Sequence, residues 1–225
     1  LYFHYPKPGL STAENILAMY RLDQNYTREE ARLLDLCMVV HADHGGGNNS
    51  AFTTRVLSST GTDIYSAISG AIGSLKGPKH GGANLAVKKQ MELVINEIGI
   101  QASELRIRQI VQDILDGDFN DHTGLIYGIG HAVYTLSDPR SEILAKQCEE
   151  LSYEKFRHDE YEFYRKFSAI AIEEIYKRKG IHVCTNVDFY SGLVYDMLGI
   201  PEDLYTLLFV IGRTVGWVAH NIESK

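Results

Sequence analysis

Five short segments place a histidine, an aspartate or an arginine beside glycines or near an expected helix end. In chain order they are HADHGGGN at 41–48, GPKHGGAN at 77–84, GIGHAVYTLSDPR at 128–140, NVDFYSG at 186–192 and IGRTVGW at 211–217. Neutral histidine can donate to a developing oxyanion, a carboxylate can remove a proton, and arginine binds carboxylates through paired hydrogen bonds. Together these residue types suit proton abstraction next to a carbonyl in a small dicarboxylate substrate.

His80 is held in a stiff and bare segment. Pro78 fixes a backbone angle two residues before it, and Gly77, Gly81 and Gly82 remove side chains on both sides. An imidazole presented in this way is placed to contact a ligand. For this segment alone, an ordinary histidine in a loop between two helices is the simpler interpretation, because glycine and proline are the usual residues of turns.

Arg213 carries the strongest single-residue argument. It lies within the apolar stretch LLFVIGRTVGWV, where a guanidinium is costly unless it is paired, because it cannot give up its charge. We therefore expect a buried anionic partner, which is either a carboxylate from another helix or the carboxylate of a ligand.

Each of the other candidates has a structural alternative. His41 and His44 are three residues apart and could form a metal pair, but neither an H-E-x-x-H motif nor an acidic ligand motif accompanies them. His131 could be a turn residue, and Asp188 could be the N-cap of a helix. Arg140 could simply bond the carboxylate two residues before it.

The composition is that of an ordinary soluble globular protein. Of the 225 residues, 44% are hydrophobic and 23% charged, and the net charge of −7 leaves no basic footprint for nucleic acid. Three scattered cysteines suggest reduced thiols, and no apolar run reaches membrane-spanning length. We expect a cytoplasmic protein with neither a nucleic-acid nor a membrane partner. Because the chain opens mid-stream with LYFHYPKPGL, we also expect a fragment of a longer protein.

The hydropathy pattern predicts an all-α protein of about ten helices, without the alternation that marks strands. Capping boxes at Ser11–Glu14 and Thr27–Glu30 start the first two helices. Pro139 suits the first position of a helix, and Gly180 suits the end of a long one. Further helices are expected at 50–59, from 63, from 84, and at 103–115, 159–179, 186–198 and 201–222, with a loop or short strand at 125–133.

Taken in order, the five segments resemble those of the citrate synthase family, and the resemblance extends over essentially the whole chain. No single segment decides it; their order and separations do. The resemblance implies the all-α citrate synthase fold, in which a large and a small helical domain enclose a cleft. Residues 1–80 and 200–225 would belong to the large domain, and residues 81–199 would form the small one.

The resemblance also implies roles for individual residues. His80 would hydrogen-bond the thioester oxygen of acetyl-CoA, and Asp188 would remove a proton from its methyl group. His131 would polarise the ketone of oxaloacetate and protonate the new alkoxide. The residues that bind oxaloacetate would be His44, Arg140 and Arg213. The loop that lies against coenzyme A would consist of Ile126, Tyr127, Gly128, Ile129 and Gly130.

The implied activity is that of citrate synthase, a transferase of the tricarboxylic acid cycle. It would condense acetyl-CoA with oxaloacetate to citrate and free CoA by enolisation, addition and thioester hydrolysis. Acetyl-CoA would be a co-substrate, no cofactor would be permanently bound, no metal is implied, and the protein would be a homodimer. The nearest alternative is 2-methylcitrate synthase, which uses propionyl-CoA. Alternatives of other classes are a non-catalytic helical scaffold and a metal-binding protein that uses His41 and His44.

Three features depart from the family pattern. The chain ends at NIESK, before the second carboxylate-binding arginine that the family usually has near its C-terminus. Many helices of the large domain would precede Leu1. The segment between His131 and Arg140 also lacks the cation that meets coenzyme A phosphates in some members. We therefore expect the fragment to lack part of the site, so that on its own it could be inactive.

Overall fold

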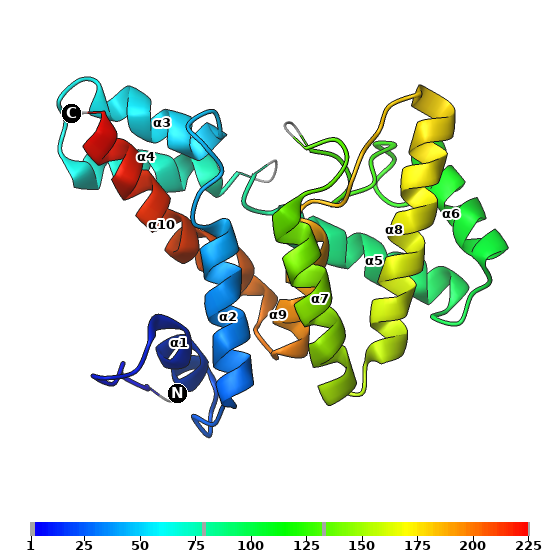
Figure 1. Cartoon of the computed structure of the whole chain (residues 1–225), viewed down its shortest axis with the longest axis horizontal. Coiled ribbons are helices and arrows are strands. Elements are labelled where there is room, and N and C mark those ends of the chain that lie inside the picture. The colour runs from blue at the N-terminus through cyan, green and yellow to red at the C-terminus, as the bar shows by residue number, and fades with distance from the viewer. Residues whose placement is uncertain (1–2, 78–79, 132–133, 225) are drawn as a thin grey trace. The chain divides into compact units, whose positions relative to one another are not determined.

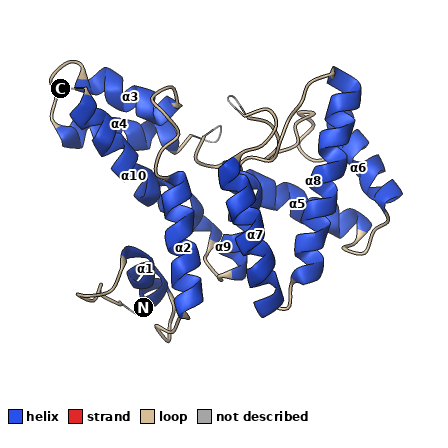
Figure 2. Ribbon diagram, in the orientation of Figure 1, coloured by secondary structure: helices blue, strands red, loops and turns tan. Residues whose placement is uncertain are grey.

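The computed structural model describes residues 3–77, 80–131 and 134–224, and this part of the chain is all-α, as predicted (Figures 1 and 2). It contains ten α-helices, one 3-10 helix and, within the described residues, a single isolated antiparallel bridge between Ile129 and Thr185. The helices are α1 (Thr12–Tyr20), α2 (Arg28–His41), α3 (Asn49–Ser58), α4 (Ile64–Leu75), α5 (Ala83–Ile98), α6 (Glu104–Asp116), α7 (Pro139–Glu154), α8 (His158–Lys179), α9 (Val187–Met197), the 3-10 helix η1 (Glu202–Leu204) and α10 (Tyr205–Glu223).

Local sequence signals explain where several helices begin and end. Ser11 and Thr27 each accept a hydrogen bond from the third residue of the following helix, and that glutamate accepts one from the cap residue in return. Both predicted capping boxes are therefore present. Pro139 is the first residue of α7. Gly180 ends α8 in the left-handed conformation that favours glycine, with φ 65°.

The last helical segment differs from the prediction. A continuous helix over 201–222 was expected, but η1 comes first and α10 begins only at Tyr205. The N–H of Leu204 bonds the carbonyl oxygen of Pro201, which is the tight i to i+3 pattern of a 3-10 turn. Short 3-10 turns of this kind are frequent at helix N-termini.

The chain divides into two compact units. The first comprises Leu1–Gly81 and Leu198–Lys225, and the second comprises Gly82–Met197. The sequence-based boundaries follow residues 80 and 199, and the assignment of these units as large and small domains stays a prediction.

In the first unit, α10 packs against α2, α3 and α4, and α3 packs along α4. Glycines let α10 approach α2 closely: a Cβ at Gly212 would lie 3.0 Å from the carbonyl oxygen of Met38. This approach brings Arg213 to the C-terminal end of α2, where the HADHGGGN segment begins. The buried cluster around α3, α4 and α10 consists of Ala51, Ala71, Leu75, Phe209 and Trp217.

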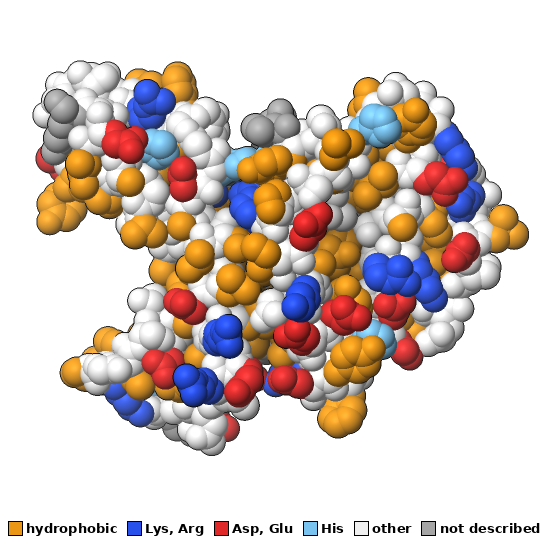
Figure 3. All heavy atoms as spheres, in the orientation of Figure 1, with side chains coloured by type: hydrophobic (Ala, Val, Ile, Leu, Met, Phe, Trp, Pro, Cys, Tyr) orange, Lys and Arg blue, Asp and Glu red, His pale blue; other side chains and the backbone are white. Residues whose placement is uncertain are grey.

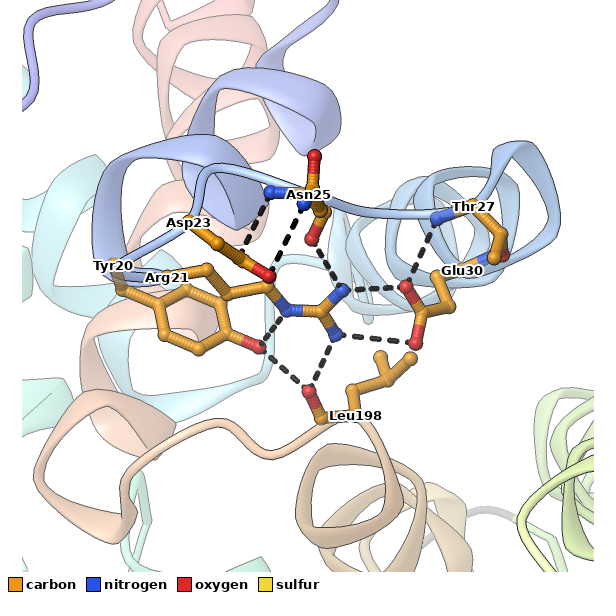
Figure 4. Close-up of polar contacts among 7 residues, drawn as sticks. All are labelled: Tyr20, Arg21, Asp23, Asn25, Thr27, Glu30 and Leu198. Carbon is orange, nitrogen blue, oxygen red and sulfur yellow. Dashed lines mark hydrogen bonds and ion pairs between the residues drawn. The ribbon is translucent and has the colours of Figure 1, made fainter.

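Arg21 ties three segments of the first unit together (Figure 4). Its guanidinium donates to both carboxylate oxygens of the buried Glu30, at 2.5 and 3.2 Å. It also donates to the backbone carbonyl oxygens of Asn25 and Leu198. Tyr20 donates to the same oxygen of Leu198 at 2.6 Å. The chain segment that starts at Leu198 is therefore fixed to α1 and α2.

In the second unit, α9 packs against α5 and α7, while α6 packs against α8. Gly192 allows the close approach of α9 to α5, since a Cβ there would lie 2.8 Å from the carbonyl oxygen of Asn84. Phe189, Val194 and Tyr195 of α9 are almost fully buried. The helix that carries Asp188 is thus anchored in the core of its unit.

The visible face of the molecule carries charged side chains of both signs (Figure 3). On the face that Figure 3 displays, Lys and Arg side chains are interspersed with Asp and Glu side chains. None of the helices in the described residues is both long enough and apolar enough to cross a membrane.

Candidate active site

His80 is hydrogen-bonded to a buried serine. Its Nε2 lies 2.9 Å from Oγ of Ser50, near the start of α3, and Ser50 is fully buried. The same Oγ accepts a hydrogen bond from Nε1 of Trp217 on α10, at 3.1 Å. Because an indole N–H can only donate, the hydroxyl keeps its own proton for another acceptor. The acceptors within reach are Nε2 of His80 and, at 3.0 Å, Oδ1 of Asn48.

The surroundings of His80 favour a neutral imidazole. Burial and the positive charge of Arg213 lower the pKa of His80 below its usual value. Near pH 7 the ring therefore carries one proton. When Ser50 donates to Nε2, that proton sits on Nδ1, which leaves an N–H for a ligand. Phe209 packs edge-to-face against the ring, with the centroids 5.6 Å apart.

Arg213 is buried on α10, with an exposed fraction of 1%. Its Nε donates to the carbonyl oxygen of His41 at 2.6 Å, and its Nη1 donates to Oδ1 of Asn48 at 3.1 Å. The guanidinium also lies over the ring of Phe209, 4.9 Å from its centroid. These acceptors are a backbone oxygen and an amide oxygen; the anionic partner that the sequence predicts, a protein or ligand carboxylate, stays a prediction. Arg213 therefore orients Asn48, the residue before α3, and Asn48 in turn accepts a hydrogen bond from Ser50.

His41 and His44 have different surroundings. His41 is buried, its Nδ1 lies 2.7 Å from the carbonyl oxygen of Cys37, and its ring packs on Phe209. His41 is thus part of the helix and core. His44 is half-buried in the loop after α2. Among the described residues, no group of three or more histidine, cysteine, aspartate and glutamate side chains is arranged to hold a metal ion.

The loop that contains His44 is held in place through the adjacent residue, Asp43. Asp43 accepts a hydrogen bond from the N–H of Gly45 at 3.1 Å, and its other oxygen lies 3.0 Å from Nε2 of His220 on α10. Burial acts to raise the pKa of Asp43, but these hydrogen bonds outweigh it and hold the pKa below the usual value. The carboxylate is therefore ionised and connects the loop to α10.

In the second unit, His131, Asp138 and Arg140 form one cluster. Oδ1 of the buried Asp138 accepts from the backbone N–H and from Nε of Arg140, both at 3.0 Å, and Oδ2 accepts from Nη2 at 2.8 Å. Nη2 of Arg140 also lies 3.2 Å from Nε2 of His131. The alternative that Arg140 bonds Asp138 is thus correct. These contacts use Nε and Nη2 and leave Nη1 out.

The tautomer of His131 follows from its partners. Its Nδ1 accepts a hydrogen bond from the N–H of Tyr134 at 2.8 Å, so a neutral ring carries its proton on Nε2. Burial lowers the pKa of His131 below its usual value; Asp138 opposes this shift and Arg140 adds to it. Nη2 of Arg140 can only donate, and it points at Nε2 of His131 from 3.2 Å. An acceptor oxygen placed beside this pair could accept from Nη2 and from an N–H at Nε2.

Asp188 lies in the first turn of α9 and is not its cap. The cap is Asn186, whose Oδ1 accepts a hydrogen bond from the N–H of Asp188 at 3.0 Å. The interpretation of Asp188 as an N-cap is therefore wrong, because the side chain two positions earlier takes that role. A carboxylate in the first turn is stabilised by the positive end of the helix dipole.

The predicted coenzyme loop is held by a buried glutamine. Gln90 of α5 donates to the carbonyl oxygen of Leu125 and accepts from the N–H of Tyr127, both at 3.0 Å. Gly128 has no room for a side chain, since a Cβ would lie 2.7 Å from Val87 and 2.8 Å from Phe189. Its φ of +78° also favours glycine. The backbone of this loop is thus fixed against α5 and α9. Part of the predicted loop or strand, residues 132–133, lies outside the described residues.

The structure groups the candidates within each unit. His80 and Arg213 are joined through Ser50, Asn48 and Phe209, whereas His131 and Arg140 are neighbours in the second unit. Whether all of these residues, with His44 and Asp188, face one cleft stays a prediction. Sequence reasoning missed other residues that orient them, which are Asn48, Ser50, Gln90, Asn186 and Trp217. Asn48 is the last residue of HADHGGGN and Asn186 is the first residue of NVDFYSG, so both asparagines lie within the quoted segments.

Comparison with known proteins shows the family of this chain. The family model described as citrate synthase, C-terminal domain, matches residues 2–225. This chain belongs to the citrate synthase family. The citrate synthase of Synechocystis sp. is 41% identical to it over 215 residues, which are 96% of this chain and 50% of that protein. The citrate synthase of Haloferax volcanii is 39% identical over 221 residues, which are 97% of this chain and 53% of that protein.

Solved structures of the citrate synthase family share the fold. The Thermoplasma acidophilum citrate synthase, in a ternary complex with carboxymethyl coenzyme A and oxaloacetate, matches with a TM-score of 0.79 and 32% identity. The match covers 97% of this chain and 54% of that one. Citryl-CoA lyase from Hydrogenobacter thermophilus matches with a TM-score of 0.70 and 27% identity, over 96% of this chain and 77% of that one. The family recognised from the five segments is confirmed, and the chain spans about half the length of the curated relatives described here.

Proposed function

We propose that the protein containing this chain is a citrate synthase, which condenses acetyl-CoA with oxaloacetate to citrate and free CoA. The observation that carries the proposal is the pairing of Nε2 of His131 with Nη2 of Arg140 in the second unit, 3.2 Å apart. A ketone oxygen that gains negative charge during addition would accept from both. Nη1 of Arg140 is then available for a carboxylate of the same substrate.

Asp188 and His80 supply the enolisation in this proposal. Asp188 removes a proton from the methyl group of the thioester, and His80 donates its N–H to the thioester oxygen. A thioester methyl is a far weaker acid than a carboxylic acid, and each pKa unit of difference costs about 1.36 kcal/mol. One oxyanion donor contributes about 3–4 kcal/mol. His80 therefore covers part of the gap, and exclusion of water from the site strengthens the same hydrogen bond.

The remaining parts of the site complete the proposal. Arg213 and His44 bind oxaloacetate together with Arg140, and residues 126–130 lie against coenzyme A. In this proposal the two compact units are the large and small domains, and the protein acts as a cytoplasmic homodimer in the tricarboxylic acid cycle. The Thermoplasma relative was solved in a complex with carboxymethyl coenzyme A and oxaloacetate, and this supports an acyl-CoA and oxaloacetate as the two substrates.

The test is the release of coenzyme A by the full-length protein with oxaloacetate. Acetyl-CoA and propionyl-CoA are compared at equal concentrations, because the latter is the substrate of 2-methylcitrate synthase. Asp188→Ala, which leaves the cap residue intact, is expected to lower the rate about a hundredfold or more, the range for one acid–base group. Absence of release with either thioester overturns the proposal, and a clear preference for propionyl-CoA replaces it with 2-methylcitrate synthase.

A further inference from the structure

Asn186 is bonded to both chain segments that carry candidate catalytic groups of the second unit. Its backbone N–H donates to the carbonyl oxygen of Gly128 at 2.9 Å, and its Nδ2 donates to the carbonyl oxygen of Gly130 at 3.0 Å. Its Oδ1 accepts from the N–H of Asp188 at 3.0 Å. Gly130 directly precedes His131. One side chain therefore connects the backbone before the histidine to the backbone of the aspartate.

The backbone around Asn186 makes this connection rigid. The N–H of Gly130 donates to the carbonyl oxygen of Cys184 at 2.8 Å, and Ile129 pairs with Thr185 in the isolated antiparallel bridge. Gly128 is pressed against Phe189, the residue that follows Asp188. Residues 128–130 and 184–186 thus form a short ladder, and the Asn186 side chain extends it toward the first turn of α9.

The chemistry of the contacts selects asparagine. The partner on Asp188 is an N–H, which can only donate, and the partner on Gly130 is a carbonyl oxygen, which can only accept. A primary amide offers an acceptor and a donor from one short planar group, and these partners fix which end is oxygen. An aspartate could still cap α9 but could not donate to Gly130, and an alanine could do neither.

We propose that Asn186 is a positioning residue that sets the spacing between His131 and Asp188. The proposal rests on the function proposed above, in which these two residues act on the two substrates of one addition step. Carbon–carbon bond formation requires both substrates at near-attack distance, and a displacement of about 1 Å can cost a hundredfold in rate. Loss of the amide is expected to move the histidine segment and the aspartate segment relative to each other.

The experiment uses the full-length protein with Asn186→Ala, Asn186→Asp and a control, Asn221→Ala. Asn221 is fully buried, and it links α10 to α3 by donating to Oγ of Ser58 at 2.7 Å. It lies in the first unit. Backbone hydrogen exchange is followed by mass spectrometry in peptides covering 125–131 and 186–192, beside kcat, KM and the pH profile of CoA release.

For Asn186→Ala we expect faster exchange in both peptides and a fall in kcat of about ten- to a hundredfold, with a smaller change in KM. Asn186→Asp keeps the cap, so faster exchange is expected mainly in 125–131. Its added negative charge raises the pKa of Asp188 and moves the acid limb of the pH profile to higher pH. Asn221→Ala is expected to lower thermal stability with neither effect.

Unchanged exchange in both peptides, or a kcat within twofold of wild type in both Asn186 variants, overturns the positioning role. The positioning role is also overturned if the loss of stability in Asn186→Ala accounts for its fall in kcat and Asn221→Ala shows an equal fall in kcat. If the wild-type protein releases no CoA, the proposed function fails, and the exchange data still decide whether Asn186 couples the two segments.

Discussion

The hydroxyl of Ser50 lies 2.9 Å from Nε2 of His80 and accepts a hydrogen bond from Trp217 at 3.1 Å. Because the indole N–H can only donate, its hydrogen bond holds the serine oxygen in place. The serine can therefore fix the orientation of the imidazole. The histidine in the glycine-rich segment is therefore held by the buried core between α3 and α10. Its orientation does not depend on the loop alone.

Ser50→Ala is expected to lower both activity and stability. The variant leaves the indole N–H of Trp217 without this acceptor, which costs about 1–3 kcal/mol of unfolding free energy. It also frees the His80 ring, so kcat for CoA release is expected to fall about ten- to a hundredfold. The measurements are denaturant unfolding and steady-state kinetics of the full-length protein.

Ser58→Ala is the matched control for this variant. Ser58 is buried on the same helix and accepts a hydrogen bond from Asn221 of α10 at 2.7 Å, while its own hydroxyl donates to the carbonyl oxygen of Thr54 and not to a histidine. It is expected to lose comparable stability with unchanged kcat. Equal kinetic losses in the two variants would show that Ser50 acts only through the stability of α3.

The lowered pKa values of His80 and His131 predict a loss of stability on acidification. The unfolded histidines take up protons near pH 6.5, whereas the folded ones do so only at lower pH. The unfolded state therefore binds more protons between these values, and stability falls as pH is lowered through this window. Below the folded pKa values the loss is complete.

Thermal unfolding of the full-length protein between about pH 7 and pH 5 measures this slope, in a range where most carboxylates stay ionised. Replacement of both histidines by glutamine is expected to flatten the curve. The prediction fails if the double variant and the wild type lose the same number of degrees over this range.

Asp138 is predicted to govern the affinity for oxaloacetate through Arg140. Burial acts to raise the pKa of Asp138, but the hydrogen bonds and charge of Arg140 outweigh it and lower the pKa. In Asp138→Asn, an amide N–H₂ would face the Nη2 donor, so the guanidinium is expected to turn away. KM for oxaloacetate is expected to rise at least about tenfold, the effect of about 1.4 kcal/mol, with a smaller change in KM for acetyl-CoA.

Asp116→Asn separates this effect from a general loss of an ion pair. Asp116 also accepts two hydrogen bonds from one arginine, Arg178, but half of its side chain is exposed. Exposed pairs of this kind contribute about 0–1 kcal/mol. KM values of this control are expected to stay at wild-type levels, and a parallel rise in both variants would contradict the specific role of Asp138.

Much of the fold and the candidate set follows from the sequence, for local reasons. Capping boxes, Pro139 and Gly180 determine helix ends through contacts within a few residues, so they can be predicted from short segments. The alternative of Asp188 as the cap of α9 is wrong because Asn186 also has a capping side chain, and only the backbone path decides between them.

The residues that orient the candidate catalytic groups could not be predicted, because their partners are far away in the sequence. Ser50 contacts Trp217 across 167 positions, and Gln90 contacts Leu125 across 35. A serine or glutamine in an amphipathic helix has no periodicity that marks it as a positioning residue. The carbonyl and amide oxygens that accept from Arg213 show the same limit, since acceptors offered by the fold cannot be read from residue charges.

Gly128→Ala is predicted to damage the candidate coenzyme loop. A Cβ there would lie 2.7 Å from Val87 and 2.8 Å from Phe189, and φ is +78°. Overpacking costs about 1–3 kcal/mol, and the backbone strain adds to it. Relief of the collision would push the loop away from α9, so KM for acetyl-CoA is expected to rise together with the loss of stability.

Gly180→Ala shares the positive φ, at +65°, but has nothing within 4 Å of a Cβ. It is expected to cost about 1 kcal/mol with unchanged kinetics, and a kinetic change of equal size in this control would remove the assignment of residues 126–130 to coenzyme A.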